Sequence, residues 1–300
     1  MGERRSLSFY VLSVVFALYV LFLYGPTITI VLLSFQGPRG GMTFPMNGFS
    51  LHWFSNLWQG IGVPYVVDAL WNSFRLGITA TILTVVISVL AGLAFRRRFI
   101  GQNLVFYATI ASLILPSIVV SLGIALEFQV FDQAIKSVGD AYGIEAIQAN
   151  YQTAMGLMTS GLGAHLTWTL PFGVLIMFAV FNRFNPAFEE AARDLGASSW
   201  QTFRYVVLPL IAPSLVGVAL FGFTLSWDEI ARSSQAVGAD NTLPLMLQGL
   251  TTSVTTPVIY ALGTVTTGIS FAVILIALGT VLLVQRRRLR HGSDAGKGLV

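Results

Sequence analysis

Cysteine and charge are the scarcest features of this sequence. Its 300 residues include no Cys, which excludes disulfides, thiolate metal sites and cysteine nucleophiles. Only 10% of the residues are charged, against roughly 25% in a typical soluble domain. So little charge cannot coat a soluble surface of this size. Because 55% of the residues are hydrophobic and the mean hydropathy is +0.75, the sequence predicts a polytopic membrane protein.

Catalytic and nucleotide-binding motifs are also missing. There is no HExxH and no GxSxG, and the 3 His residues are widely separated. There is no GxxxxGK[ST] either, so this chain cannot cradle a nucleotide by a P-loop. We therefore expect no catalytic residue, no metal ligand and no cofactor in this chain. Any ATP-driven work must be done by a partner.

Long apolar runs replace these motifs. A helix crosses about 30 Å of hydrocarbon in about 20 apolar residues. Six runs have this character: Phe9–Leu33, Leu70–Phe95, Leu104–Leu126, Leu157–Phe181, Leu208–Trp227 and Val258–Val284. The first is too long for a signal-peptide core and is followed by five more, so we expect a retained helix. The predicted fold class is an all-α polytopic membrane protein with six transmembrane helices.

The basic residues predict the orientation of these helices. With the amino terminus in the cytoplasm, most of the 17 Lys and Arg fall on the cytoplasmic side, and most of the 13 acids fall outside. Both termini are therefore expected inside. The expected organisation is a cytoplasmic segment 1–8, a six-helix domain 9–284 with a cytoplasmic loop 182–207, and a basic tail 285–300.

An aromatic stripe marks the first outer loop. Trp53, Phe54, Leu57 and Trp58 fall on one side of a short helix. Aromatic rings of this kind suit the headgroup layer of a membrane, where the apolar part of the ring is buried and its polar edge contacts water. A substrate-binding aromatic box is the alternative.

The loop 182–207 predicts two short helices with a turn between them. Asn185 can cap the first helix, and Glu189 lies four residues before Arg193, within ion-pairing reach. Gly196 can adopt the left-handed conformation that stops this helix, and Ser198 or Ser199 can cap a second one that runs to Leu208-Pro209. An amphipathic helix across the inner mouth of the bundle and an ordinary interfacial loop both fit this pattern.

The same loop carries a resemblance. Glu190-Ala191-Ala192, Gly196 and then Val206-Val207-Leu208-Pro209 resemble the EAA loop of binding-protein-dependent ABC importer permeases, with Val206 where that family usually has Ile. Further similarity, over about Phe49 to Val284, points to the spermidine/putrescine-type subgroup. It rests on Gly48-Phe49-Ser50-Leu51 with Trp53, Asn72-Ser73, His165 before Leu170-Pro171-Phe172, and Phe223-Thr224-Leu225-Ser226-Trp227-Asp228-Glu229.

This resemblance implies a type I ABC importer permease in the bacterial inner membrane. The implied partners are a second homologous permease, two ATP-binding ABC subunits that bind ATP and Mg, an extracytoplasmic solute-binding protein and the lipid bilayer. The resemblance also implies a set of ATPase-coupling residues: Glu190, Ala191, Ala192, Gly196, Leu208 and Pro209. The residue types suit this role, because alanines let backbones approach, a glycine turns the chain, and Pro209 with Pro213 could transmit a tilt into the fifth span.

Ionisable groups at the membrane edge are candidates for the solute pathway. Placing a charge there costs free energy, so such a residue is a functional-site hypothesis by default. Trp227, Asp228 and Glu229 follow the fifth span, Asp240 lies twelve residues beyond Asp228, and His165 lies in the fourth span. The acids would attract a cation, and Trp227 could add a cation–π contact. They could instead pair with Arg232, hold the outer loop or contact the binding protein. For His165, a neutral imidazole hydrogen-bonded to a neighbouring helix is the expected state.

Three classes of protein compete at this point. An ATP-driven importer subunit is favoured by the EAA-like loop and the missing P-loop. A self-sufficient secondary transporter would show inverted repeats, and a membrane-embedded enzyme would need a catalytic set. For an importer, the subgroup suggests a polyamine-like cation, while related permeases carry other small organic solutes such as amino acids or phosphonates.

Overall fold

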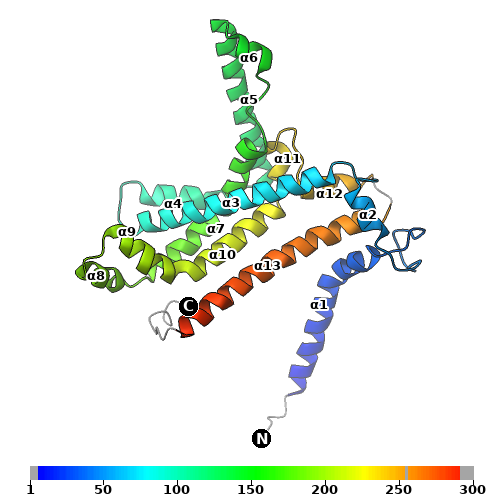
Figure 1. Cartoon of the computed structure of the whole chain (residues 1–300), viewed down its shortest axis with the longest axis horizontal. Coiled ribbons are helices and arrows are strands. Elements are labelled where there is room, and N and C mark those ends of the chain that lie inside the picture. Colours follow the sequence, from blue (N-terminus) through cyan, green and yellow to red (C-terminus); the bar gives the residue numbers. More distant parts are fainter. Residues whose placement is uncertain (1–5, 254–255, 291–300) are drawn as a thin grey trace. The chain divides into compact units, whose positions relative to one another are not determined.

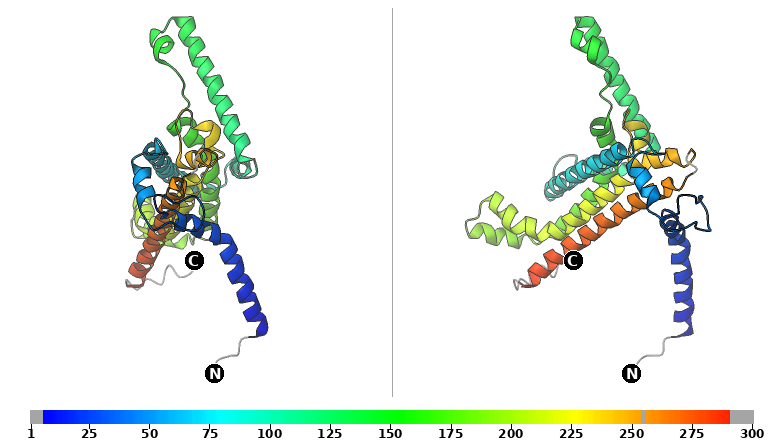
Figure 2. Two further views of the ribbon diagram at one scale, coloured as in Figure 1. Left: turned by 90° about the vertical axis from the view of Figure 1, so that its right-hand side faces the viewer. Right: turned by 45° about the vertical axis from the view of Figure 1, so that its right-hand side comes forward.

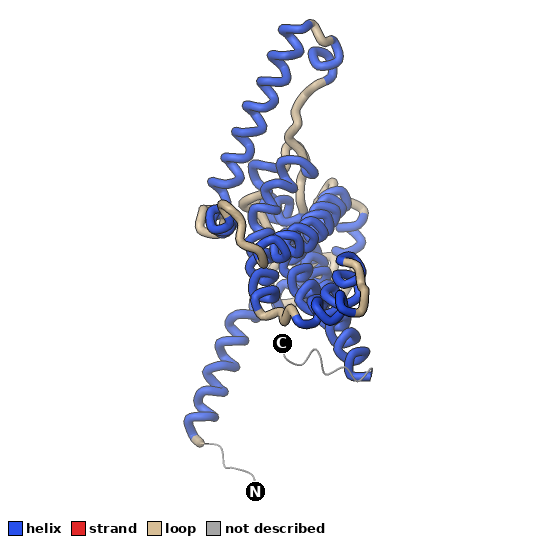
Figure 3. Tube along the Cα trace, turned by 90° about the vertical axis from the view of Figure 1, so that its left-hand side faces the viewer, coloured by secondary structure: helices blue, strands red, loops and turns tan. Residues whose placement is uncertain are grey.

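The protein is helical throughout the part that its computed structural model describes, residues 6–253 and 256–290 (Figures 1 and 3). Within those ranges there is no strand, only an isolated bridge between Gln36 and Phe49. The α-helices are α1 (Leu7–Leu33), α2 (His52–Trp58), α3 (Val66–Phe95), α4 (Gln102–Ala111), α5 (Ser117–Tyr142), α6 (Glu145–Asn150), α7 (Leu162–Asn182), α8 (Ala187–Asp194), α9 (Ser199–Thr202), α10 (Leu208–Trp227), α11 (Ser233–Ala236), α12 (Leu243–Leu250) and α13 (Val258–Arg290).

Among the described residues, six helical segments are long and apolar enough to cross a membrane, as the sequence predicts. They are Leu7–Leu33, Val66–Phe95, Ser117–Tyr142, Leu157–Asn182, Ser199–Trp227 and Val258–Leu283. The expected segment 1–8 is described only from Ser6, and the expected tail 285–300 lies outside the described residues after Arg290.

The third span is the one whose predicted position is wrong. The expected run Leu104–Leu126 is divided into α4 and α5 by a break at residues 112–116. Pro116 explains the break, because it lacks a backbone N–H and disfavours helix in the residue before it. The helix that can span starts at Ser117 and continues to Tyr142, where Gly143 stops it with a φ of 60°. The helix therefore continues well beyond Leu126, where the predicted run ends.

The chain divides into two compact units, which we describe separately. One comprises residues 1–67 and 246–269, and the other comprises 68–245 and 270–300. In the first unit, Gln36 is buried and organises the loop after α1. Its side-chain amide donates to the carbonyls of Gly41 (3.2 Å) and Thr43 (3.4 Å), and its Oε1 accepts the N–H of Asn47 (2.6 Å).

Helix α2 of this unit carries the aromatic stripe and divides it between two environments. Trp53 and Leu57 are buried, whereas Trp58 is 54% exposed. Because Trp53 packs inside the unit, only part of the stripe remains at the surface, where a membrane interface or a ligand could contact it.

The core of the second unit is built where α3, α7 and α10 pack together. Val89, Met177, Phe181, Phe184, Val207, Ile211 and Val218 form one buried apolar cluster. Small residues allow the close approach of α3 and α7: a Cβ on Gly173 would lie 2.2 Å from Ser88 Oγ and 3.0 Å from Thr84 Cγ2. The hydroxyls of Thr84 and Thr169 are 2.6 Å apart and form a buried hydrogen bond at the same contact.

We expect Gly173→Val to destabilise the protein, because a branched side chain cannot fit between α7 and α3 without displacing one helix. Overpacking of this kind costs about 1–3 kcal/mol. Gly163→Val is the matched control, since Gly163 lies in the same helix with nothing within 4 Å of its added Cβ. Thermal unfolding in detergent, followed by tryptophan fluorescence, should show a lower midpoint for Gly173→Val alone. Equal midpoints for the two variants would contradict the packing argument.

Within the second unit, α5 and α6 form a hairpin that extends away from α3, α7 and α10 (Figure 2). A Cβ on Gly139 would lie 2.5 Å from Ile147 Cγ2, so this glycine permits the contact between the two helices. The segment that follows α6 is hydrogen-bonded to α5 through Asp132, a buried residue of α5. The carboxylate of Asp132 accepts hydrogen bonds from Tyr151, Thr153 and the N–H of Ala154.

Candidate functional site

The segment between α7 and α10 has the two helices and the turn that its sequence predicts. Asn185 Oδ1 accepts the N–H of Ala187 (3.0 Å) at the start of α8. Gly196 follows the helix with a φ of +85°, and the N–H of Ala197 closes the turn onto the carbonyl of Ala192 (3.0 Å). The left-handed glycine and the Asn185 cap are therefore both confirmed.

The second helix begins with a capping box. Ser198 Oγ accepts the N–H of Gln201 (3.3 Å), and Gln201 Oε1 accepts the N–H of Ser198 (2.8 Å). Ser198, rather than Ser199, is thus the cap. The helix does not end at Leu208-Pro209: a π-helical turn, Phe203–Val207, joins α9 directly to α10. The loop is consequently connected to a transmembrane segment by continuous helix.

The residues of this segment divide into a packed side and an exposed side. Phe188 packs toward Phe184, with ring centroids 6.5 Å apart. Glu190, Ala191 and Gly196 are exposed, Ala192 and Leu208 are half-buried, and Pro209 is exposed. Three large apolar side chains are also exposed: Leu195 (89%), Trp200 (65%) and Tyr205 (70%). Exposed apolar side chains beside an exposed glutamate suit contact with another protein.

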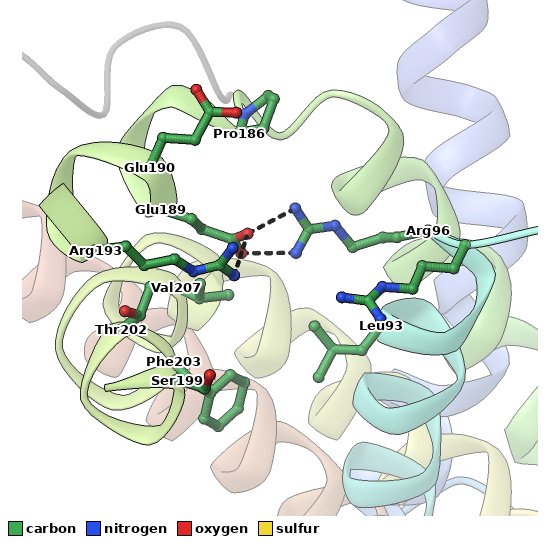
Figure 4. A pocket seen from close by; sticks show the side chains of 11 residues that line it. Leu93, Arg96, Pro186, Glu189, Glu190, Arg193, Ser199, Thr202, Phe203 and Val207 are labelled. Carbon is green, nitrogen blue, oxygen red and sulfur yellow. Dashed lines mark hydrogen bonds and ion pairs between the residues drawn. The ribbon is translucent and has the colours of Figure 1, made fainter. Parts of the chain in front are cut away.

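A pocket of ≈ 520 Å³ lies between this segment and the end of α3 (Figure 4). Arg96, Arg97 and Arg193 line it together with Glu189 and Glu190. Glu189 pairs with Arg96 at 2.6 Å and with Arg193 at 3.9 Å, so the expected i, i+4 contact exists but is the longer of the two. Sequence analysis does not predict the partnership with Arg96, which contributes there only as one of the basic residues that indicate orientation.

A second polar cluster surrounds Arg232, just beyond α10. This arginine is fully buried, and its guanidinium donates to the carbonyl of Ser112 (3.0 Å) and the hydroxyls of Ser117 (3.4 Å) and Thr167. The guanidinium carbon also lies 4.9 Å from the centre of the Trp168 ring. Burial lowers the pKa of Arg232, and the nearby charge of Glu229 partly offsets this.

His165, in α7, is hydrogen-bonded to Ser226 and Ser233, which lie before and after Arg232 in the sequence. Ser233 donates its hydroxyl proton to the carbonyl of Glu229 (2.6 Å), so His165 Nε2 must carry a hydrogen and donate it to Ser233 Oγ (2.8 Å). In a neutral imidazole, Nδ1 accepts from the hydroxyl of Ser226, whose oxygen lies 2.8 Å away. The expected hydrogen bonds to neighbouring helices are therefore present, and both ring nitrogens have partners.

The other pathway candidates have different environments. Trp227 is 1% exposed and stacks on Phe223, with ring centroids 5.4 Å apart. Glu229 Oε1 accepts the backbone N–H of Arg232 (2.9 Å) instead of pairing with its guanidinium. Asp240 Oδ2 accepts the N–H of Leu157 (3.2 Å) and so caps the π-helical turn that precedes α7. Asp228 is exposed, yet partial burial of its carboxyl by surrounding protein raises its pKa.

Comparison with known proteins finds relatives among the permease proteins of transport systems. The chain is 29% identical to a spermidine/putrescine transport system permease protein (PotC) of Haemophilus influenzae over 85% of this chain and 90% of that one. It is 26% identical to a putrescine transport system permease protein (PotI) of Escherichia coli K12, covering 92% of each chain.

Solved structures share the fold. A bacterial ABC transporter involved in import of the acidic polysaccharide alginate matches with a TM-score of 0.64 at 15% identity, covering 91% of this chain and 94% of that one. The methionine ABC transporter MetNI matches with a TM-score of 0.52 at 19% identity, covering 73% and 95%. The description "binding-protein-dependent transport system inner membrane component" fits residues 84–291, more than half of the chain. This protein therefore belongs to that family of membrane permeases.

Proposed function

We propose that this chain is a non-catalytic permease subunit of an ATP-driven, binding-protein-dependent importer in the bacterial inner membrane. Its partners would be a second permease, two ATPase subunits that bind ATP and Mg, and an extracytoplasmic solute-binding protein. The observation that carries the proposal is the exposed turn from α8 through Gly196 to α9, which is joined to a transmembrane segment by continuous helix.

In this proposal α8 docks on an ATPase subunit in the cytoplasm, which places both termini of the chain on that side. Glu190 would pair with a basic group of the ATPase, and Ala191 would allow close backbone approach. Leu195 and Trp200 offer apolar contact area beside them. A tilt imposed on α8 and α9 would pass through Leu208 and Pro209 into α10, because no loop interrupts the helical path.

The solute we propose is a small polyamine-like cation. The relatives named for spermidine and putrescine transport support this class. Asp228 is the pathway candidate best placed to meet a cation, since it is exposed, whereas Trp227 and His165 are buried. Glu229 and Asp240 already cap backbone N–H groups and would act by holding the loop around Asp228. Another small organic solute is the alternative within the same class of importer.

We expect the purified chain, alone in liposomes, to hydrolyse no ATP and to transport no putrescine, because it has no phosphate-binding motif. Tagged protein isolated gently from its native membrane should carry an ATPase subunit, identified by mass spectrometry. Reconstituted in liposomes with ATP inside and the solute-binding protein of the same importer outside, this assembly should take up radiolabelled putrescine. Uptake driven by an ion gradient, without any ATPase, would contradict the importer and favour a secondary transporter.

A further inference from the structure

Two adjacent glutamates of α8 have opposite environments. Glu189 is 9% exposed, and its two carboxylate oxygens meet the two terminal nitrogens of Arg96 at 2.6 and 3.0 Å. Glu190 is exposed, and Figure 4 shows its carboxyl group pointing away from Arg96. Only Glu190 falls in the EAA-like motif, so the buried glutamate needs an explanation of its own.

Arg96 is held on more than one side. It follows α3 directly, and its guanidinium carbon lies 5.5 Å from the ring centre of Phe181, in the last turn of α7, and 5.3 Å from that of Phe184, two residues beyond this helix. Cation–π contact and a bidentate ion pair therefore act on one group. Through this guanidinium the ends of α3 and α7 are connected to α8.

The geometry is unlike that of an ordinary surface ion pair. Exposed pairs contribute little, because water screens them and both side chains lose conformational freedom. Here the side chains are only 24% and 11% exposed, and the planar guanidinium matches both the carboxylate and the aromatic faces. Removing Glu189 would leave Arg96 without its counter-ion, and removing Arg96 would leave Glu189 with only the longer contact to Arg193, at 3.9 Å.

We propose that Arg96 and Glu189 are a positioning pair that makes α8 move as one body with the ends of α3 and α7. This inference rests on the proposed function: if an ATPase subunit displaces α8, the pair transmits that displacement to α3 and α7 as well as to α10. Glu190 faces the partner while Glu189 anchors the helix from behind. Arg193, 3.9 Å from Glu189, adds a weaker second cation.

Hydrogen exchange of α8 tests the anchoring without any partner. In full-length protein in nanodiscs, Arg96→Met and Glu189→Gln should each speed exchange of the α8 amides at least fivefold, with Arg96→Lys intermediate. Arg97→Met is the matched control: Arg97 lines the same pocket, forms no ion pair within the described residues, and should change exchange less than twofold. Unchanged exchange in Arg96→Met and Glu189→Gln would overturn the proposal.

The complete importer tests the consequence. Arg96→Met should lower the putrescine taken up per ATP hydrolysed at least fivefold, with normal assembly, while Arg97→Met should lower it less than twofold. Because the chain has no Cys, Arg96→Cys/Glu189→Cys can be bridged by a short bis-methanethiosulfonate in an importer with cysteine-free partners. Bridging should restore at least half of the lost coupling.

The outcomes separate this proposal from the proposed function. If the bridged importer stays uncoupled, a fixed link between α8 and the end of α3 is not what coupling needs. If it stops working, α8 and the end of α3 must separate during transport. Either result would overturn the proposal. If the wild-type assembly neither hydrolyses ATP nor takes up putrescine, the proposed function fails, and hydrogen exchange still decides whether Arg96 and Glu189 anchor α8.

Discussion

Gly196→Val is expected to abolish most solute uptake while the assembled complex continues to hydrolyse ATP. The φ of +85° at this position is open to glycine but severely strained for a β-branched residue. Strain of this kind costs about 1–3 kcal/mol, and the chain can relieve it by unwinding the end of α8. The turn between α8 and α9 would then point elsewhere, and we expect a loss of uptake of about fivefold to a hundredfold at that cost.

Gly101→Val is the matched control for Gly196→Val. Gly101 has a φ of +86° and, like Gly196, nothing within 4 Å of an added Cβ, but it precedes α4 and lies outside the proposed coupling residues. Both substitutions should therefore introduce a similar backbone strain, and only Gly196→Val should lower uptake per ATP hydrolysed. Glu190→Lys should uncouple in the same way through charge reversal. Normal uptake by Gly196→Val and Glu190→Lys would show that this segment is a simple connector.

Asp228→Asn is expected to raise the putrescine concentration needed for half-maximal uptake by about tenfold to a hundredfold. This follows from the proposed cationic solute, because a carboxylate near a cation at a partly desolvated mouth contributes about 1–3 kcal/mol. Asparagine keeps the shape of the side chain and removes its charge. Asp240→Asn is the comparison variant, since its oxygen can still accept the N–H of Leu157 and its effect should be smaller.

The pKa of Asp228 adds a pH dependence with a definite sign. Burial raises this pKa, so on acidification Asp228 loses its charge at a higher pH than an ordinary aspartate does. Cation uptake should weaken over that range in the wild type, and this part of the pH profile should flatten in Asp228→Asn. An unchanged half-saturating concentration, or a binding protein that selects an anion, would remove Asp228 from the pathway. Arg75, which is exposed near the start of α3, would then be the better candidate.

Local signals in the sequence were sufficient for five of the six spans and for the loop that carries the EAA-like motif. Capping by Asn185 and Ser198 involves residues two or three positions apart, and the conformation of Gly196 depends on its missing Cβ. Such features depend little on the remainder of the fold. The third span shows the limit of the same reasoning, because hydropathy alone does not register that Pro116 breaks the helix.

The partners of the charged and polar side chains were decided only by the tertiary structure. Arg96 and Glu189 are 93 positions apart, and His165 meets Ser226 and Ser233 across 61 and 68 positions. No periodicity or motif spacing encodes such pairs, since they depend on how α3, α7 and α10 pack. The sequence by itself determined six membrane-spanning helices and a capped, glycine-stopped loop helix, because short-range physics governs both. Which glutamate anchors that helix, and which acid remains exposed beside the fifth span, depended on contacts that exist only once the helices have packed together.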